Sequence, residues 1–145
     1  MIPFQDSSDV LFVAGFGPIV TDYKKSHSFY LELLKLPLKP IEEGSQYLTC
    51  EQDGLEGVKH FALWPIEQAA QSCFSQNEWP ENILTPQSWM EFEVSDIEKI
   101  TDICLKEGYV LLVNNRMEPW GQTVTRLLSP EGMLIGLTVT PWLRE

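Results

Sequence analysis

The sequence has few of the residues that most often carry disulfides, metals or nucleophilic catalysis. Only three of its 145 residues are cysteine and two are histidine. Cys50, Cys73 and Cys104 are odd in number and lack C-x-x-C spacing, which argues against a disulfide framework and a structural zinc site. Neither a G-x-S-x-G elbow nor a glycine-rich phosphate loop occurs. We therefore expect the cysteines to be free and mostly buried.

Basic residues and long apolar runs are also scarce. The chain has 10 Lys and Arg against 21 Asp and Glu, a formal net charge of −11 at pH 7. Such a chain repels phosphate backbones and anionic membrane surfaces and attracts cations. The apolar run 10–20 is broken by two glycines and a proline, short of the ~20 residues that span a bilayer, and no basic secretory signal begins the chain. We expect a cytoplasmic protein that binds neither nucleic acid nor membrane.

What the sequence does contain is a faint internal repeat. Residues 10–20 are rich in strand formers, and the following apolar positions have helical spacing. The same order recurs from residue 88, where an alternating strand runs into the capping-box pattern Ser95–Glu98. Asp22 in the first half aligns with Asp96 in the second. The chain therefore reads as one domain made of two similar modules.

Each half continues with three further strand candidates. They are residues 37–41, 46–51 and 58–64 in the first half, and 109–113, 122–128 and 133–140 in the second. The turn sequences QDGLEG and SPEG join the last two strands of each half. A candidate helix at 65–75 and a proline-marked linker, together 65–86, separate the modules. The prediction is an α+β fold of tandem βαβββ modules, about 8–64 and 87–141, with a curved mixed sheet around a cavity.

This order, and four short stretches, resemble the glyoxalase/bleomycin-resistance/dioxygenase superfamily, also called vicinal oxygen chelate proteins. The stretches are FYLELL (29–34), VSD (94–96), PWG (119–121) and SPEG (129–132). The resemblance covers nearly the whole chain and implies two modules facing each other around a cavity. Enzymes of this superfamily hold a divalent metal with side chains from strands one and four of each module, whereas its antibiotic-binding members hold none.

The resemblance places the metal-ligand positions on residues that cannot chelate: Gly15, Phe61, Trp89 and Gly136. His60 is one residue from one of these positions. Because side chains alternate across a strand, we expect His60 to face the helix, and to act as a ligand only if a bulge or another register intervenes. A metal site needs three or more convergent donors. We therefore predict no metal and no cofactor.

The period of two in residues 88–94 predicts which side chains line the cavity. Trp89, Glu91 and Glu93 face it, and the alternate apolar residues face the helix. Three roles are open for the carboxylates. They could share a proton as acid and base, form a structural ion pair with Arg126 or Lys59, or attract a cationic ligand.

Aromatic rings complete the candidate site. The indoles of Trp89 and Trp120 could stack on planar heterocycles or cations, or could simply pack in a core or an interface. The predicted ligand-binding residues are Phe61, Trp89, Glu91, Glu93, Trp120 and Arg126.

The function predicted from these features is metal-free binding of a cationic or aromatic small molecule, as in the bleomycin-resistance proteins that the chain resembles. One alternative is an enzyme, either a glyoxalase-type lyase or isomerase or a dioxygenase with displaced metal ligands, or one that uses Glu91 or Glu93 without metal. Another is a regulatory or assembly domain with a filled cavity. We also expect a homodimer, since an exposed first strand invites pairing with a second copy.

Overall fold

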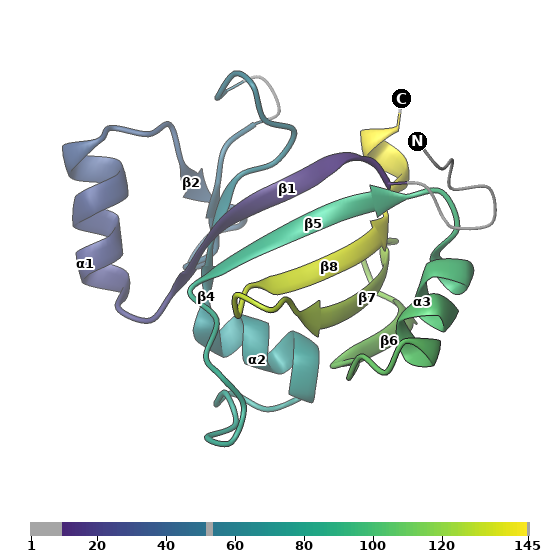
Figure 1. Ribbon diagram of the computed structural model, residues 1–145. Helices are drawn as coiled ribbons and strands as arrows, with labels where there is room; N and C mark the ends of the chain where they lie inside the picture. Colours follow the sequence, from purple (N-terminus) through teal and green to yellow (C-terminus); the bar gives the residue numbers. More distant parts are fainter. Residues whose placement is uncertain (1–9, 52–53, 145) are drawn as a thin grey trace. The chain divides into compact units, whose positions relative to one another are not determined.

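The protein is an α+β fold with eight strands (Figure 1). The computed structural model describes residues 10–51 and 54–144. The strands are β1 (Val10–Val20), β2 (Lys39–Pro40), β3 (Leu48–Thr49), β4 (Ala62–Pro65), β5 (Ser88–Val94), β6 (Val113–Met117), β7 (Thr123–Leu128) and β8 (Leu134–Val139). The helical segments are α1 (Tyr23–His27), the π-helical η1 (Ser28–Leu33), α2 (Ile66–Phe74), α3 (Ile97–Lys106) and the 3₁₀ turn η2 (Pro141–Leu143).

The sheet is mixed, and its strands are hydrogen-bonded in the order β2-β3-β4-β1-β5-β8-β7-β6. β1 and β4 run parallel, whereas β2–β3, β3–β4, β6–β7 and β7–β8 run antiparallel. The predicted fold class is confirmed. The chain divides into two compact units, one of Gly15–Trp89 and one that combines the residues before Gly15 with those from Met90 onward.

In each unit a strand leads into a helix that begins at an aspartate. Oδ1 of Asp22 accepts a hydrogen bond from the backbone N of Lys25 at 3.1 Å, which caps α1. Oδ1 of Asp96 accepts one from the backbone N of Lys99 at 3.1 Å, which caps α3. The cap of α3 is Asp96 and not Ser95, which opens the capping-box pattern in the sequence. The identical geometry supports the internal repeat.

The Gly15–Trp89 unit buries one face of β3 and β4 against α1 and η1. The buried members of this cluster are Val20, Leu38, Leu48, Phe61 and Leu63. Tyr23 of α1 and Tyr30 of η1 pack against it. Residues 61 and 63 therefore face the helical segment, and the alternate residues of β4 face the other way.

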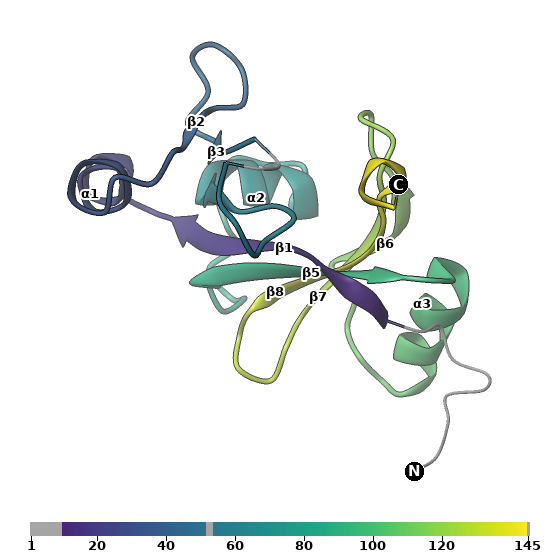
Figure 2. The ribbon, with the colours of Figure 1, turned by 90° about the horizontal axis from the view of Figure 1, so that it is seen from above.

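In the other unit, α3 covers one face of the sheet (Figure 2). The buried members of this cluster are Val94, Ile97, Leu127 and Leu137. Phe92 and Cys104 pack against it, and burial raises the pKa of the Cys104 thiol. All three cysteines are free thiols, as predicted, but only Cys73 is buried, whereas Cys50 and Cys104 are partly exposed.

The strand predicted at residues 109–113 forms further along the chain, at β6. Tyr109 and Val110 are exposed despite their high strand propensity. They follow Gly108, whose φ of +88° turns the chain at the end of α3. β6 then pairs with β7 through an irregular register between Val113 and Arg116. The predicted helix at 65–75 and the turn SPEG are present as α2 and as a turn in which N of Gly132 donates to O of Ser129 at 2.9 Å. The predicted turn QDGLEG lies partly outside the described residues.

The first strand is not at an edge of the sheet. Its predicted exposure is confirmed in part, because Val10, Leu11, Val13 and Phe16 are exposed. β1 pairs with β4 through Ile19 and Trp64, and N of Ile19 donates to O of Gln87, just before β5, at 2.9 Å. The sheet edges are β2 and β6. Among the described residues no helix is long and apolar enough to cross a membrane.

Candidate functional site

The alternation predicted for β5 is confirmed. Phe92 and Val94 belong to the apolar cluster beneath α3. Glu91 and Glu93 therefore point to the opposite face of the strand, because successive side chains of a strand alternate. The sequence SWMEFEV predicts this orientation because its polar and apolar residues alternate without interruption.

Glu91 forms an ion pair with a buried arginine of β7. Nη1 of Arg126 lies 3.0 Å from Oε2 of Glu91; the arginine is 2% exposed and the glutamate side chain 14%. Of the three roles left open for this carboxylate, the structure forms the ion pair.

Gly136 of β8 provides the space for this pair. A methyl group at residue 136 would lie 2.8 Å from Cγ of Glu91 and 3.1 Å from Nη1 of Arg126. Contacts under 3.0 Å force atoms to move, so any side chain here would displace the carboxylate. At the position where the resemblance places a metal-binding glutamate, the chain has Gly136, which packs against the Glu91–Arg126 ion pair.

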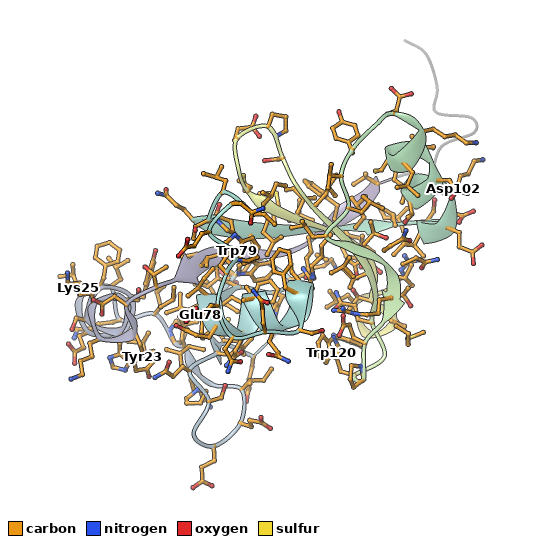
Figure 3. The ribbon with its side chains drawn as sticks, turned by 90° about the horizontal axis from the view of Figure 1, so that it is seen from below. Tyr23, Lys25, Glu78, Trp79, Asp102 and Trp120 are labelled. Carbon is orange, nitrogen blue, oxygen red and sulfur yellow. The ribbon has the colours of Figure 1, made fainter. Side chains whose placement is uncertain are left out.

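Gln122 links the ion pair to an exposed indole, and the sequence reasoning missed it. Its Nε2 donates to Oε1 of Glu91 at 2.9 Å and to Oγ1 of Thr138 at 2.8 Å. Its Oε1 accepts a hydrogen bond from Nε1 of Trp120 at 2.9 Å. Trp120 is 56% exposed and lies in the turn between β6 and β7 (Figure 3). Gln122 lies an even number of residues before Arg126, so an extended chain places both side chains on the same face, and this spacing was the available signal.

Glu93 has a structural role at the C-terminal turn. Its fully buried Oε2 accepts hydrogen bonds from the backbone N of Thr140 and from Nε of Arg144, both at 2.6 Å. Arg144 also donates to the carbonyl oxygen of Val94. These contacts hold the segment that follows β8 against β5. A side chain that is both fully buried and so engaged does not line an accessible site.

Trp89 lies in the Gly15–Trp89 unit and is almost fully buried. Its Nε1 donates to the carbonyl oxygen of Ala62 at 3.2 Å. A methyl group on Gly15 would lie 3.1 Å from Cη2 of Trp89, and one on Gly17 would lie 3.1 Å from its Nε1. The indole therefore lies over the two glycines of β1. This contact joins Gly15 and Trp89, two of the four positions at which the resemblance places metal ligands.

His60 lies on the same face as Trp89, so its predicted orientation was wrong. The rings of His60 and Trp89 are 6.0 Å apart between centroids, and Nε2 of His60 is 2.8 Å from Oη of Tyr47. Phe61 instead packs in the apolar cluster under α1 and η1, and so falls outside the candidate site. The sequence does not show which residues of KHFALWP face the helix, because this stretch is apolar on both faces of the strand.

These donors do not fit a metal ion. Among residues 10–51 and 54–144, no three His, Cys, Asp or Glu side chains are grouped so that they could hold one. His60 is hydrogen-bonded to a tyrosine, and Glu91 is paired with an arginine. A catalytic zinc site requires three protein ligands with an open position, which this arrangement does not supply.

Comparison with solved structures defines the fold. The chain is similar to a glyoxalase/bleomycin resistance protein/dioxygenase superfamily member from Vibrio splendidus 12B01, with 16% identity, a TM-score of 0.56, and coverage of 92% of this chain and 100% of the other. It is also similar to an extradiol ring-cleaving dioxygenase from B. fuscum, with 19% identity, a TM-score of 0.59, and coverage of 94% of this chain and 34% of that one. The chain has the fold of the glyoxalase/bleomycin resistance/dioxygenase superfamily.

A third similar structure is an NAD-dependent benzaldehyde dehydrogenase from Legionella pneumophila, with 14% identity, a TM-score of 0.53, and coverage of 86% of this chain and 96% of the other. The chain spans about a third of the dioxygenase. No family model matches the sequence, and no curated protein matches it. The superfamily fold is thus shared with proteins of different activities, so the function must be argued from the site.

Proposed function

We propose that the protein binds a planar aromatic small molecule without a metal, as the bleomycin-resistance proteins of this superfamily fold do. The observation that carries the proposal is the closed Glu91–Arg126 pair above Gly136. The pair lies where a chelating carboxylate would be needed, and both oxygens of Glu91 are engaged, Oε2 by Arg126 and Oε1 by Gln122. Metal-dependent lyase, isomerase or dioxygenase chemistry has no matching ligand set among these residues.

The ligand would stack on Trp120. This indole is exposed, and its Nε1 is fixed by Gln122, so the ring is held in one orientation. A fixed, exposed aromatic face binds planar rings and cations at little cost in conformational entropy. Oε1 of Glu91 lies on the other side of Gln122. The partly exposed edge of that carboxylate would accept a hydrogen bond from a ligand amine.

The expected charge of the ligand depends on two contributions, the charged groups near Trp120 and the net charge of the whole chain. Nearby carboxylates are paired: Glu91 with Arg126, Glu93 with Arg144, and Glu118 with Arg116 at 2.6 Å. The local field is therefore close to balanced. The whole chain still carries −11 and draws cations towards it. We infer that aromatic character determines binding and that a positive charge increases the affinity.

The test is a binding measurement with matched probes. Acridine, which is neutral, and aminoacridine, which is cationic, are titrated into chelator-treated protein by calorimetry and by thermal shift. We expect both to raise the melting temperature, because a ligand of the native state stabilises it, and the cation to bind more tightly.

Two tryptophan variants locate the site. Trp120→Ala should weaken binding about tenfold, which corresponds to a stacking energy of ~1–2 kcal/mol. Trp142→Ala removes another exposed indole, in η2, and should bind as the wild type does. The proposal is wrong if neither probe binds, or if Trp120→Ala binds them unchanged. A filled-cavity assembly domain predicts that first result.

A further inference from the structure

The segment that follows β8 is held to the sheet by one arginine and one buried carboxylate. Figure 1 shows η2, in yellow, beside the end of β5. Nε of Arg144 donates to Oε2 of Glu93 at 2.6 Å, and its Nη2 donates to the carbonyl oxygen of Val94. The side chain of Glu93 is fully buried, whereas that of Arg144 is 30% exposed. The other carboxylate oxygen, Oε1, has no hydrogen-bond donor among the described residues, so the buried charge depends on the donors to Oε2.

Two threonines extend this contact across the face of the sheet that carries Glu91. The backbone N of Thr140 donates to the same Oε2 of Glu93 at 2.6 Å. The hydroxyl oxygen of Thr140 is 2.9 Å from that of Thr138, and Nε2 of Gln122 donates to the Thr138 oxygen at 2.8 Å. Because Thr138 accepts from Gln122, its own hydroxyl hydrogen is available for Thr140. These groups are buried, and hydrogen bonds in a low dielectric polarise and orient one another.

Gln122 joins this chain of hydrogen bonds to the indole of Trp120. Its Oε1 accepts from Nε1 of Trp120 at 2.9 Å, while its Nε2 donates to Glu91 and Thr138. A carboxamide has one acceptor end and one donor end, so only one of its two flipped orientations satisfies all three partners. The opposite orientation would place two donors together at Trp120 and two acceptors together at Glu91. The orientation of this amide therefore decides whether the Trp120 ring is held.

The Trp120 ring depends on this bond because the turn that carries it leaves the side chain in water. N of Gly121 donates to O of Glu118 at 2.9 Å, which closes the turn and fixes its backbone. Trp120 itself is 56% exposed. An exposed side chain keeps its rotamer freedom unless a specific contact removes it. The hydrogen bond to Gln122 is such a contact.

We propose that Arg144 is a positioning residue for the indole of Trp120. It acts through four hydrogen-bonded residues in turn: Glu93, Thr140, Thr138 and Gln122. Without Arg144 the buried carboxylate keeps only a backbone donor, so the segment loosens and the hydroxyls and the amide lose their shared orientation. The effect on ligand affinity rests on the proposed function, whereas the effect on the order of the ring does not.

Hydrogen exchange of the Trp120 indole measures this positioning without a ligand. The Nε1–H signal is followed by NMR and is assigned by its absence from the spectrum of Trp120→Ala. Arg144→Gln should speed the exchange about fivefold, because it removes the charged donor from the buried carboxylate. Trp142→Ala is the matched control. It alters η2 but not the hydrogen-bonded chain, and should leave the exchange within about twofold of the wild type.

Thr140→Val tests the route. It removes the hydroxyl that contacts Thr138 but keeps the backbone N that donates to Glu93. The variant should itself speed the indole exchange, and in its background Arg144→Gln should add less than about twofold. Circular dichroism, with exchange of the backbone amides of β7 and β8, separates loss of ring order from a general loss of stability.

Three results would overturn the proposal. They are an indole exchange that neither Arg144→Gln nor Thr140→Val changes, an effect of Arg144→Gln that persists in full in Thr140→Val, and an equal acceleration of the β7 and β8 amides. Titration with aminoacridine tests the proposed function separately. Arg144→Gln should weaken binding about threefold, whereas Trp142→Ala should not. A wild type that binds no acridine contradicts the proposed function alone, because the indole exchange decides the positioning by itself.

Discussion

At the scale of single residues, Gly136 and Glu91 form one structural unit with Arg126. The carboxylate passes directly over the glycine, and the guanidinium lies beside both. A glycine is therefore required here by the close approach of side chains and not by its backbone angles. A side chain at this position would meet the Glu91 carboxylate and the Arg126 guanidinium in their present places.

Substitution of either Glu91 or Gly136 should lower the free energy of unfolding. Glu91→Ala takes away the carboxylate that faces a buried guanidinium, and we expect a loss of about 3 kcal/mol in the free energy of unfolding. Gly136→Ala inserts a methyl group 2.8 Å from Cγ of Glu91, which should cost ~1–3 kcal/mol. Urea denaturation of each variant measures these changes.

The double variant Glu91→Ala/Gly136→Ala tests whether the methyl group at residue 136 meets the carboxylate of Glu91 or only disturbs the packing. Once Cγ of residue 91 is gone, the cost of Gly136→Ala should fall to less than half, so the two effects are not additive. Glu131→Ala, at an exposed turn position, is the control and should change stability by less than about 0.5 kcal/mol. Additive costs would show that the methyl group does not meet the carboxylate.

At the scale of elements, strands differ in how much of their orientation the sequence reveals. β5 alternates polar and apolar residues, so the faces of Glu91 and Phe92 were predictable. β4 has apolar residues on both faces, so only its pairing decides that Phe61 faces the helix and His60 faces Trp89. The parity of Gln122 with Arg126 indicates which face its side chain lies on, but its contact with Trp120 depends on the turn between β6 and β7, which the sequence does not specify.

The two helix caps should be energetically equivalent. Asp22→Ala and Asp96→Ala both remove the capping hydrogen bond of 3.1 Å to the backbone N three residues later. Each should cost about 1 kcal/mol in urea denaturation, the usual value for an N-cap. Thr21→Ala is the matched control for Asp22→Ala and should cost clearly less. If instead Thr21→Ala proves the more costly change, the cap of α1 is wrongly assigned.

At the scale of the whole molecule, the fold alone does not determine the chemistry. Proteins with similar structures include a ring-cleaving dioxygenase and a dehydrogenase, while the residues of this chain supply indoles, a closed ion pair and bare glycines. We propose that the net charge of −11 favours cations over anions and that the exposed Trp120 is the surface on which a planar ring binds. The function that we propose for this chain is therefore argued from its side chains and not from its fold.

The most direct measurement of this claim is calorimetric titration of chelator-treated, tag-free protein with Zn²⁺, Mn²⁺, Fe²⁺ and Ni²⁺, with the metal content of the purified protein measured alongside. We predict less than a stoichiometric amount of each metal in the purified protein and no saturable binding in the low micromolar range. One ion bound per chain, and lost when His60 or Glu91 is replaced by alanine, would contradict the account.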